Sequence, residues 1–164
     1  MGAVYRVTDT KLHREVAIKG RWIAYLTRGT LATLWKVDAG GAAPPVRIAE
    51  SNVSVAPAWS PDRKWITTAV DGKIGVVSPD GARKRVCFDA DYTEFHSTIG
   101  WSHDGSTLYL LELIGDHHRL SAYDVKRDAV RVIRDYPPDG RFYAESSDPL
   151  RGCILLPTAS AGNR

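Results

Sequence analysis

The sequence predicts an all-β fold that repeats a unit of four antiparallel strands. The stretch that begins at Trp59 reads WSPDRKWI, and 42 residues later the stretch that begins at Trp101 reads WSHDGSTL. The apolar residues that follow each stretch alternate with polar ones or form short buried runs, as strands do, and no segment keeps a helical period. Units that recur about every 40 residues build propellers or solenoids, because each unit covers the apolar face of the next.

Turn-forming residues separate the expected strands. In the segment 60–62 (Ser-Pro-Asp), the proline presets the backbone angle φ, and the aspartate can accept hydrogen bonds from nearby backbone N–H groups. In the next unit His103 replaces the proline, but Asp104-Gly105 remains, and its glycine supplies the positive φ that lets the chain reverse. Similar turns recur at 78–81 and 38–41. Each unit is therefore predicted to be two tight hairpins joined by a loop.

These turns place the first unit, or blade, at about residues 14–50, the second at 53–88 and the third at 95–134. A degraded fourth unit opens near Tyr143. Residues 157–164 are small and polar, and we expect them to be disordered. Since closed rings use about four to eight blades, the predicted architecture is a partial β-propeller. It has about three four-stranded antiparallel blades plus an incomplete fourth.

Two segments resemble a known repeat family. Residues 57–81 (PAWSPDRKWITTAVDGKIGVVSPDG) and 99–125 (IGWSHDGSTLYLLELIGDHHRLSAYDV) are similar to the PD40, or TolB-like, repeat of bacterial proteins, which is related in shape to WD40 blades. The resemblance covers about residues 20–156 and implies propeller blades with a binding role. The sequence departs from the repeat at Arg63, where the turn glycine is missing, and at His103, where the proline is missing.

The first 19 residues resemble another family. MGAVYRVTDTKLHREVAIK is similar to the start of a bacterial serine/threonine protein kinase, with Gly2 as the last glycine of the glycine-rich loop and a V-A-I-K strand. In that family Val4 and Ala17 would contact adenine, and Lys19 would hold the α- and β-phosphates. The resemblance thus implies a vestigial ATP site formed by Gly2, Val4, Ala17 and Lys19.

Other kinase motifs are missing from the sequence. Phosphoryl transfer relies on H-R-D-x-x-x-x-N and D-F-G to position the hydroxyl and to bind magnesium. His13-Arg14 and His118-Arg119 are followed by Glu15 and Leu120 instead of aspartate. We therefore expect no catalysis and no cofactor. We interpret the chain as a fragment of a kinase–propeller fusion in which the propeller is a binding, scaffold or sensor segment.

A second interpretation of residues 1–19 requires no kinase ancestry. The strand that contains residues 16–18 stands one repeat before the strand at Trp59, so it can be the first strand of blade one. Residues 3–7 could pair with it as an antiparallel hairpin, and Lys19 would then be a turn residue in water. The predicted organisation is a kinase-like hairpin at 1–19, propeller blades at 20–156 and a tail at 157–164.

Composition fits one modest domain of 164 residues, of which 43% are hydrophobic and 25% charged. The net charge of +3 favours neither a nucleic-acid nor a membrane partner.

No metal site is predicted. Cys87 and Cys153 do not have the spacing of zinc ligands, and His117 and His118 point to opposite faces if they lie on a strand. Without a secretory segment or a long apolar run, the chain as written is expected in the cytoplasm, although a parent fusion could be membrane-attached with the propeller outside.

An open arc of blades exposes strand edges and an apolar flank. We therefore expect a protein partner or self-association through these edges.

Two other functions stay open. One is an ATP-binding kinase remnant, and the other is the propeller of a prolyl-oligopeptidase-like peptidase, whose G-x-S-x-G motif this chain lacks. Four loop residues could face a partner or be ordinary surface, namely Tyr92, Glu94, Arg141 and Tyr143.

Overall fold

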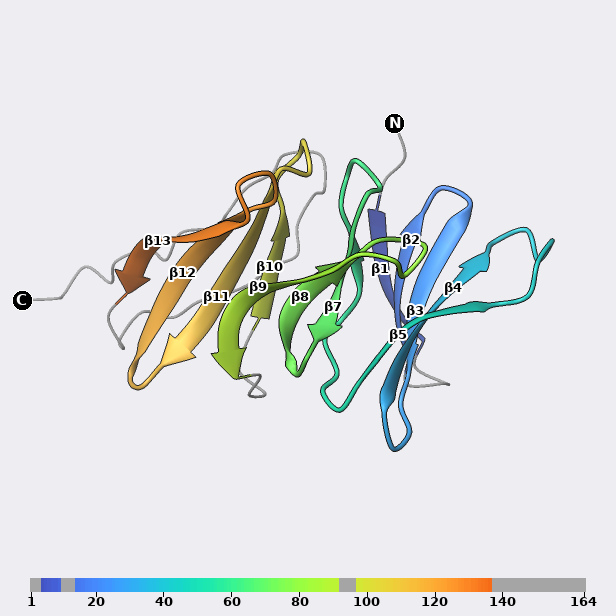
Figure 1. Ribbon diagram of the computed structural model, residues 1–164, viewed down its shortest axis with the longest axis horizontal. Coiled ribbons are helices and arrows are strands. Elements are labelled where there is room, and N and C mark those ends of the chain that lie inside the picture. Colours follow the sequence, from blue (N-terminus) through green and yellow to red (C-terminus); the bar gives the residue numbers. More distant parts are fainter. Residues whose placement is uncertain (1–3, 10–13, 92–96, 137–164) are drawn as a thin grey trace, which may run out of the picture. The chain divides into compact units, whose positions relative to one another are not determined.

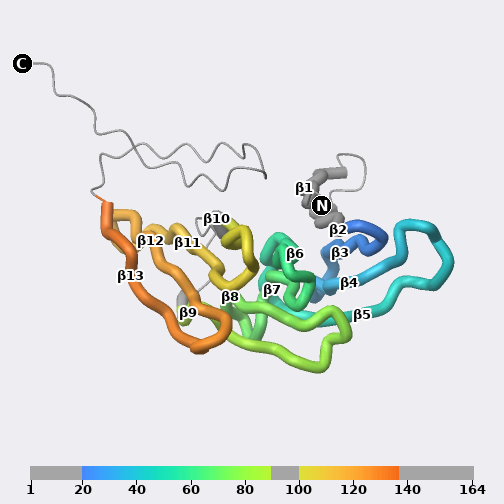
Figure 2. Tube along the Cα trace, turned by 90° about the horizontal axis from the view of Figure 1, so that it is seen from above, coloured from blue at the N-terminus to red at the C-terminus, as the bar shows by residue number. Residues whose placement is uncertain are grey.

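The computed structural model describes the backbone of residues 4–9, 14–91 and 97–136, and the side chains of residues 20–89 and 100–136. Within these ranges the chain forms thirteen strands and no helix, which confirms the all-β prediction. The strands make three antiparallel sheets, and in each sheet they follow one another in chain order (Figure 1, Figure 2). No helix of the described chain is long and apolar enough to cross a membrane.

The chain divides into two compact units, residues 1–92 with the first and second sheets and residues 93–164 with the third. The first sheet contains β1 (Val4–Asp9), β2 (Arg14–Lys19), β3 (Trp22–Thr27), β4 (Ala32–Asp38) and β5 (Val46–Ser51). The second contains β6 (Ala58–Trp59), β7 (Ile66–Val70), β8 (Lys73–Val77) and β9 (Lys84–Asp91). The third contains β10 (Ser97–Trp101), β11 (Thr107–Ile114), β12 (His117–Asp124) and β13 (Ala129–Tyr136).

The first sheet has one strand more than the other two, because β1 pairs antiparallel with β2 at its edge. Val4 is the register partner of Lys19 in this pair of strands. Lys19 in turn stands opposite Trp22 across the two-residue turn between β2 and β3. Gly20 occupies that turn with a φ of 61°, a conformation that costs glycine little because it has no Cβ.

An apolar core joins the first and second sheets within their unit. Its buried side chains come from β3, β4 and β5 on one side and from β6, β7 and β8 on the other. Each large side chain buried in such a core stabilises the fold by about 1.5–3 kcal/mol. The core residues are Ala24, Leu26, Leu34, Ile48, Ala49, Trp59, Ile66 and Val77, with Trp22 packed against them.

Backbone packing between these two sheets is also close. A Cβ atom added to Gly81, in the turn between β8 and β9, would lie 2.9 Å from the carbonyl oxygen of Ile48 in β5. Gly81 also has a φ of 77°. A side chain at this position would therefore meet both a steric and a conformational penalty. Glycine lets this turn contact the neighbouring sheet.

The second sheet confirms the expectation of strands covered on both faces. Every residue of β7 is buried, as are Ile74–Val77 of β8. The third sheet differs on its last strand, where all residues of β13 except Tyr136 are exposed. Val130 and Val132 of β13 are 50% and 52% exposed, and Ile133 is 39% exposed. Hence β13 exposes three large apolar side chains.

Three turns share one hydrogen-bond pattern, in which a serine is followed two residues later by an aspartate. In the turn between β6 and β7, the Ser60 hydroxyl donates to Asp62 (2.6 Å) and accepts from the backbone N–H of Trp65 (3.0 Å). Asp62 also accepts from the backbone N–H of Lys64 at 3.1 Å. The side chains thus satisfy backbone groups that a hairpin turn leaves unpaired.

The same set of bonds recurs at Ser78 and Asp80 between β8 and β9, and at Ser102 and Asp104 between β10 and β11. The residue after each aspartate has a positive φ, which is 77° at Gly81 and 71° at Gly105. The recurrence explains why serine and aspartate keep their spacing where the residue between them changes from proline to histidine.

These hydrogen bonds stabilise the charged form of the aspartates. The Ser102 hydroxyl (2.7 Å), the Ser106 backbone N–H (3.0 Å) and the Ser106 hydroxyl (2.8 Å) lower the pKa of Asp104 from 3.8 to about 2. The pKa of Asp80 is lowered by the hydroxyl of Ser78 and the backbone N–H of Ala82. Burial of Asp62 by itself raises its pKa, but the bonds from Ser60 and Lys64 outweigh it and the pKa is lowered.

We predict that these turns weaken in acid. Because the folded pKa of Asp104 lies below its unfolded value, its contribution to stability is complete above about pH 4 and is lost as the pH falls through about 2. Denaturant unfolding of the wild type and of Asp104→Asn between pH 7 and pH 2 measures this contribution. The variant should be less stable at pH 7 and should lose less stability in acid. Parallel pH curves for the two proteins would contradict the prediction.

Candidate functional site

A pocket of about 180 Å3 opens between the first and second sheets, within their unit. Its walls are the rings of Trp22, Trp59 and Pro79 and the long side chains of Lys36 and Arg63. Trp22 begins β3, Lys36 lies in β4 and Trp59 ends β6. Pro79 and Arg63 come from two of the serine–aspartate turns. The same turns that close the hairpins therefore also form this site.

Lys36 is held in the pocket wall by two contacts. Its ammonium donates to the backbone carbonyl of Pro79 at 2.6 Å and lies 4.9 Å from the ring centroid of Trp22. The guanidinium of Arg21 lies 5.0 Å from the same ring and pairs with the buried carboxylate of Asp38 at 2.8 Å. Cations this close to an indole are attracted by the negative face of the ring. The contacts of Lys36 with Pro79 and with the Trp22 ring fix the tryptophan and the lysine relative to each other.

Arg63 differs from the other residues of the pocket in its backbone. Its φ is 63°, the left-handed conformation that glycine adopts at the equivalent positions of the other two serine–aspartate turns. A non-glycine residue in this conformation costs about 1–3 kcal/mol. The backbone N–H of Arg63 donates to the carbonyl oxygen of Ser60 at 2.9 Å, so the turn holds this conformation through its backbone. The Arg63 side chain makes no hydrogen bond, ion pair or ring contact with any described residue.

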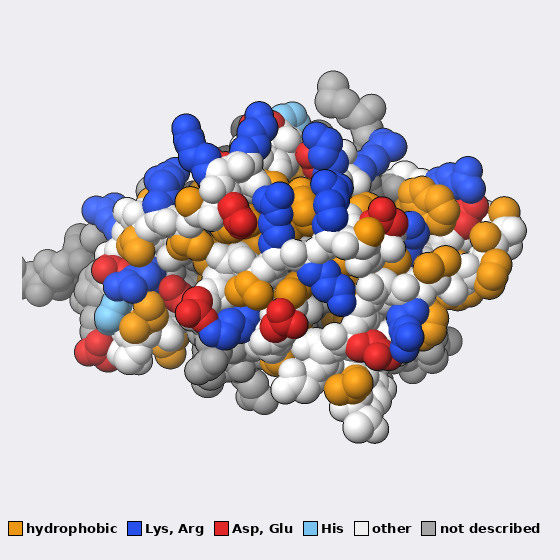
Figure 3. All heavy atoms as spheres, in the orientation of Figure 1, with side chains coloured by type: hydrophobic (Ala, Val, Ile, Leu, Met, Phe, Trp, Pro, Cys, Tyr) orange, Lys and Arg blue, Asp and Glu red, His pale blue; other side chains and the backbone are white. Residues whose placement is uncertain are grey.

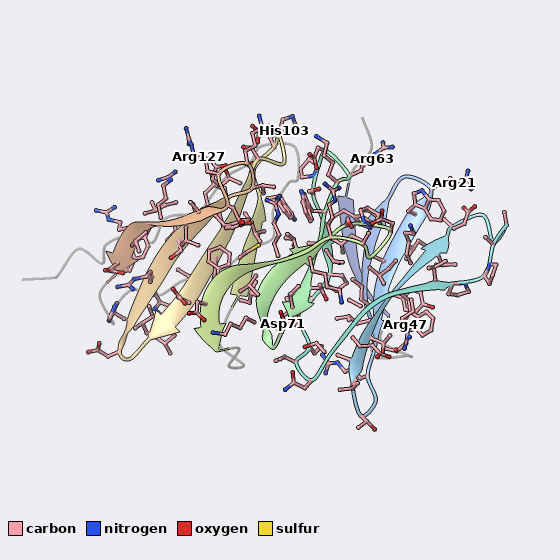
Figure 4. All side chains as sticks on the ribbon, in the orientation of Figure 1. Arg21, Arg47, Arg63, Asp71, His103 and Arg127 are labelled. Carbon is pink, nitrogen blue, oxygen red and sulfur yellow. The ribbon has the colours of Figure 1, made fainter. Side chains whose placement is uncertain are left out.

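Several basic side chains lie in the pocket wall or over nearby tryptophan rings. Figure 3 shows Lys and Arg side chains interspersed with Asp and Glu side chains on the face that it draws, and Figure 4 places Arg21 and Arg63 at the same end of their sheets, with Asp71 at the opposite end of the second sheet. Arg83 and Arg85 lie 4.9 Å and 5.0 Å from the ring centroid of Trp65. This end of the unit therefore carries several cations together with the carboxylates of Asp38, Asp62 and Asp80.

Three of the four residues of the predicted ATP site lie on strands of the first sheet, and one of them, Lys19, stands opposite the pocket residue Trp22. Val4 of β1 and Lys19 of β2 are register partners, and Ala17 pairs with Ala24 of β3. Gly2 lies outside the described residues. The backbone thus brings Val4 and Lys19 to one end of a hairpin, and the assignment of an ATP site to them stays a prediction.

Other sequence candidates contribute little to a site. His117 and His118 begin β12, and no group of three or more His, Cys, Asp or Glu side chains is placed to hold a metal among the residues with described side chains. Cys87 is buried. The four loop residues Tyr92, Glu94, Arg141 and Tyr143 lie outside the described ranges.

Sequence reasoning did not find the pocket, although one signal for it was visible. Arg63 stands where the repeat has glycine, and a bulky residue at a left-handed position is a mark of function when nothing local explains it. Trp22 and Trp59 were expected as sheet residues, and nothing in the sequence brought Lys36 to Pro79, 43 residues later.

Solved structures resemble this chain in fold. A putative TolB from Agrobacterium tumefaciens matches with a TM-score of 0.52 and 19% identity, over 72% of this chain and 47% of its own. TolB from Acinetobacter baumannii matches with a TM-score of 0.54 and 19% identity, over 69% and 30%. An oligogalacturonate lyase from Vibrio parahaemolyticus matches with a TM-score of 0.52 and 15% identity, over 84% and 42%.

The fold is a partial β-propeller of the TolB type. Its blades are the antiparallel sheets described above, and the chain spans less than half the length of each of these three solved propellers. No protein-family model matches the sequence, and no curated protein matches it. At identities of 15–19%, the similarity of this chain to these structures shows a shared fold alone. The incomplete fourth blade expected after residue 136 lies outside the described residues.

We predict that Arg63 can be replaced by glycine without loss of stability. Glycine relieves the left-handed strain but increases the freedom of the unfolded chain, so the free energy of unfolding of Arg63→Gly should be unchanged or higher by about 1 kcal/mol. Chemical denaturation measures it. The control is Lys64→Gly in the same turn, at a position without positive φ, which should destabilise by about 0.5–1 kcal/mol. A large loss for Arg63→Gly would mean that its side chain stabilises the propeller.

Proposed function

We propose that this chain is a non-catalytic binding segment of a β-propeller, and that it engages a protein partner at the end of blades one and two where the pocket opens. The observation that carries the proposal is Arg63, whose backbone is strained and whose charged side chain lines the pocket without a described partner. Residues in this conformation cluster at binding and active sites. Three non-glycine residues of the described chain adopt it, namely Arg63, Asp71 and Asp128, and of these Arg63 lines the pocket.

The surroundings of the pocket support a binding role. Aromatic and arginine side chains are the residues most enriched at the centres of protein interfaces, and both line this pocket. The exposed side chains of Val130, Val132 and Ile133 on β13 support a second contact, with further blades or with another copy of the chain. These residues lie in the other unit of the chain and belong to a separate surface.

We propose further that the parent protein joins a serine/threonine kinase domain to this propeller. One support is the resemblance of residues 1–19 to the start of a kinase domain. The other is that this chain covers less than half the length of each solved propeller that it matches. In such a protein the propeller is the sensor or docking part. The lyase likeness, at 15% identity, gives no support for lyase activity in this chain.

A nucleotide thermal-shift assay separates the binding role from the ATP-binding alternative. We expect Mg-ATP to leave the melting temperature of the full chain unchanged, since the motifs that hold magnesium are missing from its sequence. The same assay on Lys19→Ala provides the control. Stabilisation by Mg-ATP that disappears in Lys19→Ala would overturn the non-catalytic proposal and favour a kinase remnant.

Site-specific photo-cross-linking tests which end of the propeller binds. A benzoylphenylalanine at the exposed Ala82, in the same turn as Pro79, should form adducts with one protein partner in cells of the source organism. The matched control is the exposed Asn52, which lies beside Gly72 at the opposite end of the second blade. Adducts from position 82 alone support the proposal. Equal yields from both positions, or none from position 82, contradict it.

A further inference from the structure

We infer that the pocket binds the side-chain carboxylate of a glutamate in a protein partner. This inference rests on the proposed binding role, and it names the chemical group that the pocket recognises. Two of its five lining side chains, Lys36 and Arg63, are cations, and none is acidic. Such a lining attracts an anion and disfavours a cation.

The other cations near the pocket each have an ion pair or a ring contact within the described chain. Arg21 pairs with Asp38 at 2.8 Å, and Lys64 pairs with Asp62 at 3.3 Å. Arg83 and Arg85 lie over Trp65 in the second blade. Lys36, in contrast, uses one of its three N–H groups on the Pro79 carbonyl and has no ion pair with a described residue. Lys36 and Arg63 are therefore two cations of the pocket wall that have no carboxylate partner among the described residues.

The donor geometry favours a carboxylate. The guanidinium of Arg63 carries five N–H groups in a planar fork, none of which is used by a described residue, and this fork matches the two oxygens of a carboxylate. Lys36 is fixed by Pro79 and Trp22 and can supply a second charge. A carboxylate in the pocket would thus meet two cations whose own partners leave room for it.

A phosphate fits this lining less well. Tight phosphate sites in turns use several free backbone N–H groups. In the turn that carries Arg63, the N–H groups of Arg63, Lys64 and Trp65 already donate to Ser60 and Asp62. The negative charge of Asp62 also lies in this turn. These features favour a single negative charge over a dianion.

The size and the apolar walls of the pocket determine which side chain can carry the carboxylate. A pocket of about 180 Å3 is smaller than the 300 Å3 or more of typical small-molecule sites. It suits one side chain, whose methylene groups can pack on Trp22, Trp59 and Pro79. Because each buried methylene strengthens binding about fourfold, glutamate should bind more tightly than aspartate.

An NMR titration of the full chain tests this inference. The probes are acetyl-Gly-Glu-Gly-amide, its glutamine and aspartate counterparts, the phosphoserine counterpart and inorganic phosphate, each taken into the millimolar range. We expect the glutamate peptide to shift the indole N–H signals of Trp22 and Trp59 to saturation. Binding should be at least about tenfold weaker for the glutamine peptide, which keeps the shape and loses the charge.

Variants of the chain locate the binding group. Arg63→Gly, which restores the glycine of the other turns, and Lys36→Met should each weaken binding of the glutamate peptide at least about tenfold. Lys84→Ala is the control, because Lys84 is an exposed cation of β9 outside the pocket, and it should change binding less than about twofold.

The inference is overturned if the glutamine peptide binds as tightly as the glutamate peptide, if Arg63→Gly has no effect, or if phosphate or the phosphoserine peptide binds more tightly. Absence of any shift with the glutamate peptide also overturns it. If adducts still form at position 82 in that case, the ligand class is wrong while the proposed binding role stands. If neither adducts nor shifts appear, both fail.

Discussion

The fold depends on one constraint, which is that a β-sheet with two apolar faces cannot cover both of them alone. Blade one and blade two meet this constraint by sharing a core, in which Leu34 and Ile48 pack with Trp59 and Ile66. The close approach of Gly81 to the Ile48 carbonyl shows how tightly the two sheets are packed. Because the contact is between sheets, every residue at its edge is positioned by two repeats and not by one.

The serine–aspartate turns give the hairpins that they close the same local geometry. In each serine–aspartate turn two short side chains satisfy backbone N–H groups, so the strands on either side can separate and twist without leaving buried polar groups unpaired. The left-handed residue after the aspartate completes the reversal. Two of the three turns use glycine there, and the third uses Arg63, which places a cation at the junction of two blades.

Most of the fold could be predicted from the sequence because its determinants are local. The residues of each turn lie within six positions of one another, and the alternation along each strand follows from burial of its faces. The pocket could not be predicted in the same way. Lys36 meets the Pro79 carbonyl across 43 residues, the length of one repeat, and no local pattern indicates that contact. Arg63 was visible only as a departure from the repeat.

The sequence by itself determined that the chain is all-β, that its strands recur with a fixed period and that the turns carry serine and aspartate at set positions. Those features depend on backbone conformation and on hydrogen bonds between near neighbours. Only the tertiary structure decided that Trp22, Lys36, Trp59, Arg63 and Pro79 meet in one pocket, and that Arg63 lacks a described partner. The reason is that the pocket exists only when two blades have packed, so its geometry belongs to the pair of sheets and to neither sequence segment alone.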